Sequence, residues 1–342
     1  MNKVRIVVVG AGQWGRNHVR TVASLPGAQL TAVCDLSDDR RKAMAHQYPG
    51  VLVSADLDAV LDVADGVVVA TPVISHADVA RAAMARGLPV LIEKPMALTV
   101  DDAEDLVRRV DAGEGPVVVG HLLVFHPAVE YLQRMVAGGE LGSIFYLYSQ
   151  RVNLGQVRPD ENALWSFGPH DVSVALRLLG EEPARVSAHG RSYLQPGIED
   201  VVFLTMELNS GVMVHVQMSW LDPHKVRRLT VVGSKKMVVF DDMQPREKIK
   251  VYDKGVGKPP TYGSYGESLA VREGDIVIPR IPNVEPLRAE LAHFLAVVRG
   301  EEESRSSARD GLQVVRILDA ATRSLRSGGD PVELGQVTTE SS

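Results

Sequence analysis

The chain has 342 residues, enough for two domains and a sizeable core, and its 45% hydrophobic and 23% charged residues are ordinary for a soluble globular protein. A formal net charge of -6 provides no overall basic field, so the sequence predicts no nucleic-acid partner. The single cysteine, Cys34, excludes an intrachain disulfide framework and a cysteine-only metal site. The sequence contains neither a leader-like segment nor an apolar run long enough for a membrane helix, so we expect a cytoplasmic protein without membrane contacts.

Short and almost continuously apolar strands alternate with helices in the first part of the chain. This alternation is typical of βαβ units, and right-handed crossovers then give a doubly wound parallel sheet of the Rossmann type. The expected strands are residues 3–10, 29–35, 66–72, 89–93 and 116–120. The expected helices are residues 17–25, 37–48, 75–87 and 99–113, with Ser37 and either Thr99 or Asp101 as N-caps.

After about residue 121 the pattern changes to strands that follow one another, several of them alternating apolar and polar residues as in MVHVQMSW. This pattern predicts an α/β domain with an open, mainly antiparallel mixed sheet. The expected strands are residues 143–154, 184–194, 200–208, 212–221, 227–233 and 236–242, and the expected helices are 126–142, 162–179, 286–299 and 308–325. We predict a domain at residues 1–121, a second at 122–332, a long flexible loop at 254–268 and a disordered tail at 333–342.

The turn after the first strand, VVVGAGQWGRNH, carries a G-x-G-x-x-G arrangement. Gly10 permits the tight turn, Gly12 lets the backbone approach a pyrophosphate, and Gly15 allows close packing of helix on strand. Asp35 ends the second strand, where a carboxylate would accept hydrogen bonds from ribose hydroxyls and repel a 2′-phosphate. The sequence therefore predicts NAD binding, and NAD rather than NADP, although two arginines stand nearby at Arg40 and Arg41.

The segment LPVLIEKPMALT at residues 88–99 ends an apolar strand with Glu93, Lys94 and Pro95. Ligands of open parallel sheets bind at the carboxyl ends of the strands, which is also where the glycine turn lies. Proline disfavours the α region for the residue before it, so Lys94 is held extended. Such a lysine beside a cationic nicotinamide would have its amine acidified and aimed at a substrate hydroxyl. The residues alone leave open that Glu93 and Lys94 only mark the exit of a strand into solvent.

The combination of GAGQWG, ATPVISHADVA, EKPMAL and GPHDVSVALRLLG resembles the glucose–fructose oxidoreductase/inositol dehydrogenase (Gfo/Idh/MocA) family over nearly the whole chain. The resemblance implies a Rossmann domain followed by an α/β domain with an open mixed sheet, and sheet-to-sheet homodimers or homotetramers. It implies that Glu93 and Lys94 lie at the nicotinamide, that the Lys94–Pro95 peptide is often cis, and that Lys94 works with His170. Many members carry an aspartate four residues before this histidine, where this chain has Ser166. The Asp–Lys–His constellation of the inositol dehydrogenases is therefore incomplete in this chain, which argues against the same proton relay and the same substrates here.

Lys94 and His170 are the predicted catalytic residues. The spacings of a zinc site are absent, and hydride transfer needs no metal when a lysine can polarise the oxygen, so no metal is expected. The predicted cofactor-binding residues are Gly10, Gly12, Gln13, Trp14, Gly15, Asp35, Thr71, Pro72, His76, Glu93, Lys94 and His121.

A narrower resemblance, in GHLLVFHPAV, YLYSQRVNLGQVRPDENALWSFGPHD and SWLDPHKVRRLTVVGSKKMVVFDD, is to nucleotide-sugar dehydrogenases that include UDP-N-acetylglucosamine 3-dehydrogenases. Their products are 3-keto sugars, which a partner aminotransferase converts to amines. Side-chain donors just ahead of the His170 helix suit sugar hydroxyls or a diphosphate, although such residues are also common on surfaces. The predicted substrate residues are Arg151, Asn153, Arg158, Asn162, Trp165 and Asp171.

The sequence thus predicts NAD-dependent oxidation of a secondary hydroxyl, C3 of UDP-N-acetylglucosamine or a near relative, in amino-sugar biosynthesis. His170 would act as general base and Lys94 would stabilise the developing alkoxide, although the two roles could be exchanged. The first alternative is a dehydrogenase or ketoreductase for another sugar or inositol. The second is a non-catalytic NAD-sensing regulator, against which the presence of both Lys94 and His170 argues.

Overall fold

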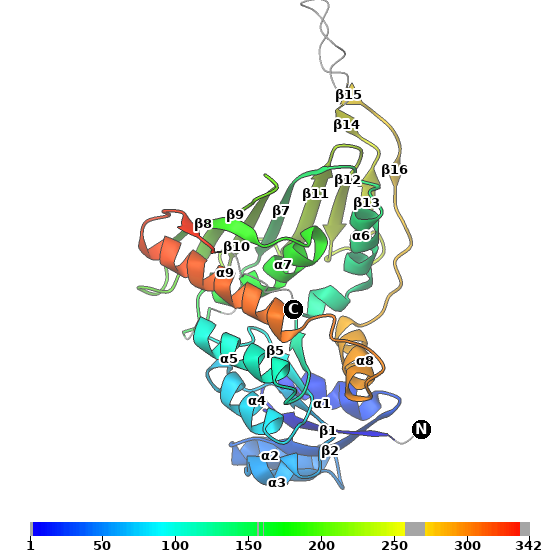
Figure 1. Ribbon diagram of the computed structural model, residues 1–342, viewed down its shortest axis with the longest axis vertical. Helices are drawn as coiled ribbons and strands as arrows, with labels where there is room; N and C mark the ends of the chain where they lie inside the picture. The colour runs from blue at the N-terminus through cyan, green and yellow to red at the C-terminus, as the bar shows by residue number, and fades with distance from the viewer. Residues whose placement is uncertain (1–2, 156, 160, 257–270, 336–342) are drawn as a thin grey trace, which may run out of the picture. The chain divides into compact units, whose positions relative to one another are not determined.

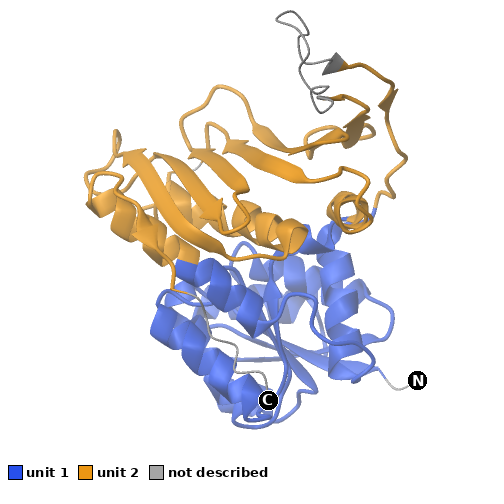
Figure 2. Cartoon of the chain, turned by 45° about the horizontal axis from the view of Figure 1, so that its top comes forward, with its two compact units in different colours: residues 1–126, 284–316 blue, residues 127–283, 317–342 orange. Residues whose placement is uncertain are grey.

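The computed structural model describes residues 3–155, 157–159, 161–256 and 271–335. The chain forms two compact units (Figure 2). The first unit comprises residues 1–126 and 284–316, and the second comprises residues 127–283 and 317–342. The sequence placed one boundary after residue 121 and gave no sign that residues 284–316 return to the first unit. Their return depends on tertiary packing, because α8 (Pro286–Val298) contacts α1 (Gly15–Ser24).

The first unit contains a six-stranded parallel sheet in the order β3-β2-β1-β4-β5-β6. Its central strands are apolar and fully buried, as in the run Gly66–Val69, because helices cover both faces of such a sheet. The predicted doubly wound Rossmann sheet is confirmed, with β3 added at its edge. The strands are β1 Val4–Val9, β2 Ala28–Cys34, β3 Leu52–Ser54, β4 Gly66–Val69, β5 Val90–Glu93 and β6 Val117–Gly120.

Helices follow these strands where the sequence predicted them (Figure 1). Ser37 caps α2 by accepting a hydrogen bond from the backbone N–H of Arg40, and Thr99 caps α5 by accepting one from Asp102. A short helix and two 3₁₀ turns were not predicted, since they are too brief to show a period. The helices are α1 Gly15–Ser24, α2 Asp38–Gln47, α3 Leu57–Leu61, η1 Val73–Ser75, α4 His76–Met84, α5 Val100–Asp111, η2 Leu122–Phe125 and α8 Pro286–Val298.

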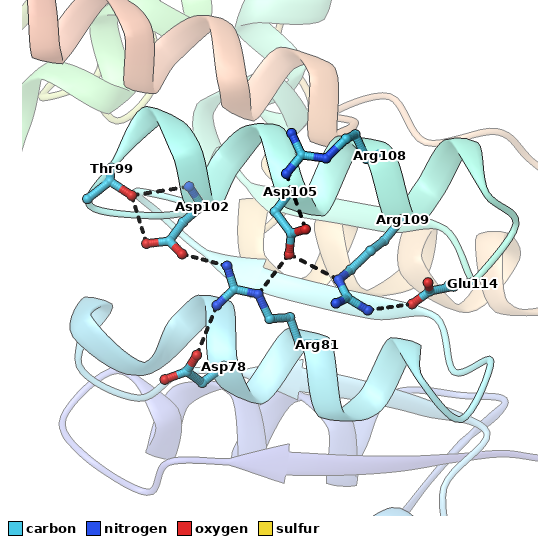
Figure 3. Close-up of polar contacts among 8 residues, drawn as sticks. All are labelled: Asp78, Arg81, Thr99, Asp102, Asp105, Arg108, Arg109 and Glu114. Carbon is cyan, nitrogen blue, oxygen red and sulfur yellow. Dashed lines mark hydrogen bonds and ion pairs between the residues drawn. The ribbon is translucent and has the colours of Figure 1, made fainter.

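An arginine joins α4 to α5, the helices that follow β4 and β5 (Figure 3). Arg81 lies 2.9 Å from Asp78 on its own helix, 2.5 Å from Asp102 and 2.8 Å from Asp105 on α5. The hydrogen bonds from Arg81 and Arg109 lower the pKa of Asp105 to about 2. The Arg81 guanidinium therefore links α4 to α5, the two helices that begin after the loops at the ends of β4 and β5.

The second unit contains a nine-stranded sheet in the order β16-β13-β12-β11-β7-β10-β9-β8-β17. Every neighbouring pair is antiparallel except β10 with β7, which confirms the predicted open, mainly antiparallel mixed sheet. The strands are β7 Ile144–Val152, β8 Pro183–Arg191, β9 Val201–Leu208, β10 Met213–Ser219, β11 Val226–Gly233, β12 Met237–Asp241, β13 Ile249–Tyr252, β16 Ile276–Val277 and β17 Val332–Glu333. A separate pair is formed by β14 Gly255–Val256 and β15 Val271–Arg272.

Helices α6 (Pro127–Ala137) and α7 (Ala163–Leu179) pack against each other, and α7 contacts β7, β9 and β10. Helix α9 (Ala308–Arg326) begins in the first unit and ends in the second. Within the described residues, no helix combines the length and apolar character needed to cross a membrane. The predicted flexible loop falls largely on residues 257–270, and most of the predicted tail on 336–342, both outside the described residues.

Candidate functional site

The glycine turn between β1 and α1 is a position where side chains do not fit. Gly10 has φ +94°, and a Cβ there would lie 2.5 Å from the carbonyl oxygen of Ala70. A Cβ on Gly15 would lie 1.9 Å from the carbonyl oxygen of Gly10, so only glycine allows the helix to start against the strand. A Cβ on Gly12 would meet only Arg40, at 3.8 Å. The backbone at Gly12 is thus open to a ligand, which suits the pyrophosphate of a dinucleotide.

Asp35 follows β2 and ties this turn to the sheet. Its Oδ2 accepts a hydrogen bond from the backbone N–H of Ala11 at 2.7 Å, and its Oδ1 accepts one from Ser37 at 2.8 Å. Arg40 approaches the same carboxylate at 3.5 Å from a side chain that is half exposed. The carboxylate is only 7% exposed, and its charge at the end of β2 disfavours a 2′-phosphate.

Glu93, at the carboxyl end of β5, connects the glycine turn to Lys94. Its Oε1 accepts a hydrogen bond from Trp14 Nε1 and lies 2.6 Å from His18 Nε2. Its Oε2 accepts a hydrogen bond from the backbone N–H of Lys94 at 3.1 Å. Burial acts to raise the pKa of Glu93, but His18 and Lys94 hold it below the ordinary value. The Lys94–Pro95 peptide is cis, as the resemblance implied. Lys94, the predicted catalytic residue, is partly exposed.

The loop after β4 carries three further predicted cofactor residues, Thr71, Pro72 and His76. Pro72 is exposed, and Thr71 is partly exposed and accepts a hydrogen bond from Ser75 at 2.8 Å. His76 is 2% exposed, and its ring nitrogens each lie 2.9 Å from a main-chain carbonyl oxygen, that of Pro95 and that of Thr71. Thr71 and Pro72 are therefore accessible to a ligand, whereas the ring of His76 is occupied within the chain.

Gln13 and Trp14 lie at the start of α1 and are both exposed, Trp14 at 41%, so the indole can face a ligand while its nitrogen binds Glu93. His121, which follows β6, is buried and contacts the hydroxyl of Ser306 at 3.0 Å. Burial lowers the pKa of His121 to about 4, so the ring is neutral near neutral pH. Ser306 belongs to the returning segment, which is why the sequence gave no sign of this contact.

Two buried residues beside Glu93 were missed by the sequence analysis. His18, on α1, is fully buried, and Glu290, on α8, is 1% exposed with no hydrogen-bond partner for either carboxylate oxygen. Burial, followed by the charge of Glu93, raises the pKa of Glu290 well above its ordinary value and so favours the neutral acid. In the described part of the chain, these three side chains are the one group with metal-ligating spacing, within 4.8 Å. Since N–H donors already occupy Glu93, we assign no metal there.

In the second unit, His170 lies near the middle of α7, directly after Pro169, and is partly exposed. Ser166 is buried one turn before it. A serine hydroxyl cannot take the place of the carboxylate that many family members carry at this position, because it brings no negative charge. This position on the helix therefore carries a neutral hydroxyl in place of a carboxylate.

Arg151 and Asp171, both predicted to bind substrate, form a buried ion pair between β7 and α7. Arg151 Nε lies 2.5 Å from Asp171 Oδ2, and Ser149 donates a hydrogen bond to Asp171 Oδ1 at 2.5 Å. The two charged side chains are 8% and 6% exposed. This pair fixes α7, and with it His170, against the sheet.

The remaining predicted substrate residues lie in and after β7 and at the start of α7. Asn162 caps α7 through the N–H of Trp165 and donates a hydrogen bond to Glu199 at 2.6 Å. Trp165 donates a hydrogen bond from its indole to Thr322 at 3.0 Å. Arg158 forms an exposed ion pair, and Asn153 is partly exposed and bonded to the sheet through its backbone N–H. Arg158 is thus the exposed member of the set, whereas Asn153, Asn162 and Trp165 are all partly exposed.

Known proteins resemble this chain along most of its length. The family model GFO_IDH_MocA, described as an oxidoreductase family with an NAD-binding Rossmann fold, matches residues 4–121, and the GFO/IDH/MocA C-terminal domain matches residues 129–239. An inositol 2-dehydrogenase from Saccharopolyspora erythraea is 34% identical over 63% of this chain and 66% of its own length.

Two further comparisons cover nearly the whole chain. A UDP-N-acetylglucosamine 3-dehydrogenase from Acidithiobacillus ferrooxidans is 28% identical over 94% of this chain and 96% of its own length. A crystal structure from Magnetospirillum magnetotacticum superposes with a TM-score of 0.79 at 32% identity, over 94% of this chain and 100% of that one. The family matches, together with the open backbone at Gly12, identify NAD as the cofactor. The chain belongs to the Gfo/Idh/MocA family of NAD-binding oxidoreductases.

Proposed function

We propose that the protein is an NAD-dependent dehydrogenase for a nucleotide sugar, and that it oxidises the C3 hydroxyl of UDP-N-acetylglucosamine or a near relative. The observation that carries the proposal is the chain of hydrogen bonds from Trp14, in the glycine turn, through Glu93 to the backbone of Lys94. It links the dinucleotide-binding turn to a lysine at the carboxyl end of β5, where ligands of open parallel sheets bind. The product would be a 3-keto sugar for amino-sugar biosynthesis.

The proposed mechanism uses two side chains, Lys94 and His170. Bound NAD supplies the hydride acceptor. The Lys94 ammonium hydrogen-bonds the reacting oxygen and stabilises the alkoxide charge that develops as hydride leaves. His170 takes the hydroxyl proton as general base, since the ordinary pKa of histidine lies near working pH. Glu93 fixes the backbone of Lys94, and the Arg151–Asp171 pair fixes the helix of His170.

The choice of a nucleotide sugar is supported by a UDP-N-acetylglucosamine 3-dehydrogenase that is 28% identical over 94% of this chain, while an inositol 2-dehydrogenase from Mycolicibacterium smegmatis is 29% identical over 98% of it. Arg158 offers a guanidinium that suits a diphosphate, and Asn153 offers an amide that suits a hydroxyl or an acetamido group. Ser166 stands where the resemblance implies an aspartate in the inositol dehydrogenases, so their Asp–Lys–His constellation is incomplete here.

Oxidation of an inositol is the second candidate, since the relative with 34% identity is an inositol 2-dehydrogenase. A panel of UDP-sugars, free sugars and inositols, monitored for NADH absorbance, separates the two. We expect turnover with UDP-N-acetylglucosamine or a related nucleotide sugar and at least tenfold lower kcat/KM with free polyols. Turnover only with inositols or free sugars would contradict the nucleotide-sugar assignment. NAD binding without turnover on any of them would favour a regulator.

We also propose that the protein forms a homodimer or homotetramer through the exposed face of its nine-stranded sheet. Four large apolar side chains on β7, β9 and β10 lie on that face, opposite α7, and each is 39–48% exposed: Tyr146, Tyr148, Phe203 and Met213. A second copy of the chain would bury them. Light scattering should show an oligomer for the wild type and a smaller species for Tyr148→Glu, whereas a monomeric wild type would contradict this assignment.

A further inference from the structure

His76 is a buried histidine whose two ring nitrogens are both directed at the main chain. It begins α4, and its Nδ1 lies 2.9 Å from the carbonyl oxygen of Pro95, its Nε2 2.9 Å from that of Thr71. Carbonyl oxygens only accept hydrogen bonds, and a neutral imidazole has a single N–H to donate. His76 is only 2% exposed and both of its ring nitrogens face the main chain. Neither nitrogen is therefore available for direct contact with NAD, even though the residue lies close to the cofactor loops.

The two carbonyls belong to the loops after neighbouring parallel strands. Thr71 follows β4 and Pro95 follows β5, and these strands pair directly, with Val69 opposite Ile92. One imidazole therefore links the two loops on the ligand-binding edge of the sheet.

The backbone of the Lys94 turn is contacted on both sides of the lysine. On its amino side, the carboxylate of Glu93 accepts the Lys94 N–H at 3.1 Å. On its carboxyl side, the carbonyl of Pro95 contacts His76. Burial lowers the pKa of His76, while the two carbonyls and Glu93 oppose that effect. A neutral ring can donate its single N–H to only one of the two carbonyls, and in the tautomer protonated at Nδ1 it donates to Pro95 and holds the Lys94 turn.

We propose that His76 is a positioning residue for Lys94, acting on the reaction through the Pro95 carbonyl and not as a ligand of NAD. The inference rests on the proposed function, because it requires Lys94 to be the reacting amine. Displacement of a reacting group by about 1 Å can lower turnover by about 100-fold. Loss of His76 should therefore lower kcat and leave the dissociation constant of NAD nearly unchanged.

Substitution of His76 by alanine, asparagine and glutamine tests the proposal. His76→Ala should lower kcat by about 10- to 100-fold. The amide nitrogen of asparagine takes the place of Nδ1, which faces Pro95, and that of glutamine takes the place of Nε2, which faces Thr71. His76→Asn should therefore retain more turnover than His76→Gln, an order that a role in stability alone does not require.

His293 provides the matched control, because it is also buried in the first unit and uses both ring nitrogens, on Glu302 and on the N–H of Arg305. His293→Ala should lower the melting temperature but leave kcat per folded enzyme within about twofold of wild type. Folded His76→Ala with wild-type kcat, or with NAD binding weakened in proportion to the lost activity, would overturn the inference. Lys94→Ala, measured alongside, separates the two claims, because unchanged turnover in that variant refutes the proposed function itself.

Discussion

The buried pair of Arg151 and Asp171 allows a sharp prediction about the helix that carries His170. Asp171→Asn keeps the shape of the side chain and removes its charge, which leaves the guanidinium of Arg151 buried without its partner at 2.5 Å. Arg227 lies opposite Arg151 on β11, and burial, followed by the charge of Arg151, lowers the pKa of Arg227. The variant would therefore leave two arginines close together with one fewer compensating carboxylate.

Breaking a buried ion pair by removing one partner costs about 3–5 kcal/mol. For a domain of about 150–250 residues, each kcal/mol lowers the melting temperature by about 2–4 °C, so Asp171→Asn should melt roughly 10 °C below wild type. Urea unfolding followed by circular dichroism measures the free energy directly. Glu161→Gln is the matched control, because its partner Arg158 is 48% exposed and such pairs contribute less than about 1 kcal/mol.

The double variant Arg151→Met/Asp171→Leu separates a structural role from a substrate-binding role. Replacing a buried pair by apolar residues is often neutral, so the double variant should recover most of the stability that Asp171→Asn loses. Recovered stability with an unchanged KM would assign the pair to the scaffold, and a raised KM would support the substrate role predicted from the sequence. A loss below about 1 kcal/mol in Asp171→Asn would refute the argument from burial.

Three further predictions follow from the first unit. The pKa of Glu290 is raised in the folded state, so the folded wild type loses stability as the pH rises from the ordinary pKa of 4.5 toward the folded-state pKa. Glu290→Gln lacks this titration and should gain stability relative to wild type over that pH range, as measured by urea unfolding. A stability difference that stays constant with pH would contradict this. Gly15→Ala, whose Cβ would lie 1.9 Å from Gly10, should lower both stability and NAD affinity, whereas Gly12→Ala should fold normally and lose only NAD affinity in fluorescence titration. Equal effects of the two would contradict the account of the turn. Arg81→Ala should cost about 1 kcal/mol near neutral pH. Since the pKa of Asp105 is lowered from 3.8 to about 2, that cost should disappear as pH falls through this range; a cost that persists there would contradict the ion-pair account.

The fold could be predicted from the sequence because its signals are local. The run Val4–Val9, the glycine turn after it and the caps at Ser37 and Thr99 each report on a few consecutive residues. The change from continuous to alternating apolar strands likewise distinguished the parallel from the antiparallel sheet. What local patterns could not give was the return of residues 284–316 to the first unit, since that depends on contacts between distant segments.

The reliance on local sequence patterns also explains which candidate site residues could be predicted. Gly10, Asp35 and Lys94 stand at strand ends within recognisable motifs, and the structure places them directly after β1, β2 and β5, at the edge where open parallel sheets generally bind ligands. His18 lies one turn after Trp14 on the buried face of α1, so its helical spacing was a usable signal that was overlooked. Glu290 looked like an ordinary helix residue, because only the packing of α8 brings it to Glu93. The internal pairing of Arg151 with Asp171 was equally hidden, since the two residues lie 20 positions apart on a strand and a helix that no sequence motif joins.

The most direct test of the central claim is the turnover of Lys94→Ala, measured together with its dissociation constant for NAD. The ammonium is assigned to the developing alkoxide, so its removal should lower kcat by at least about 100-fold with the preferred sugar substrate. NAD affinity should change little, because the glycine turn and Asp35 are untouched. A Lys94→Ala enzyme with near-normal turnover would contradict the account, because no other amine is assigned to the reacting oxygen.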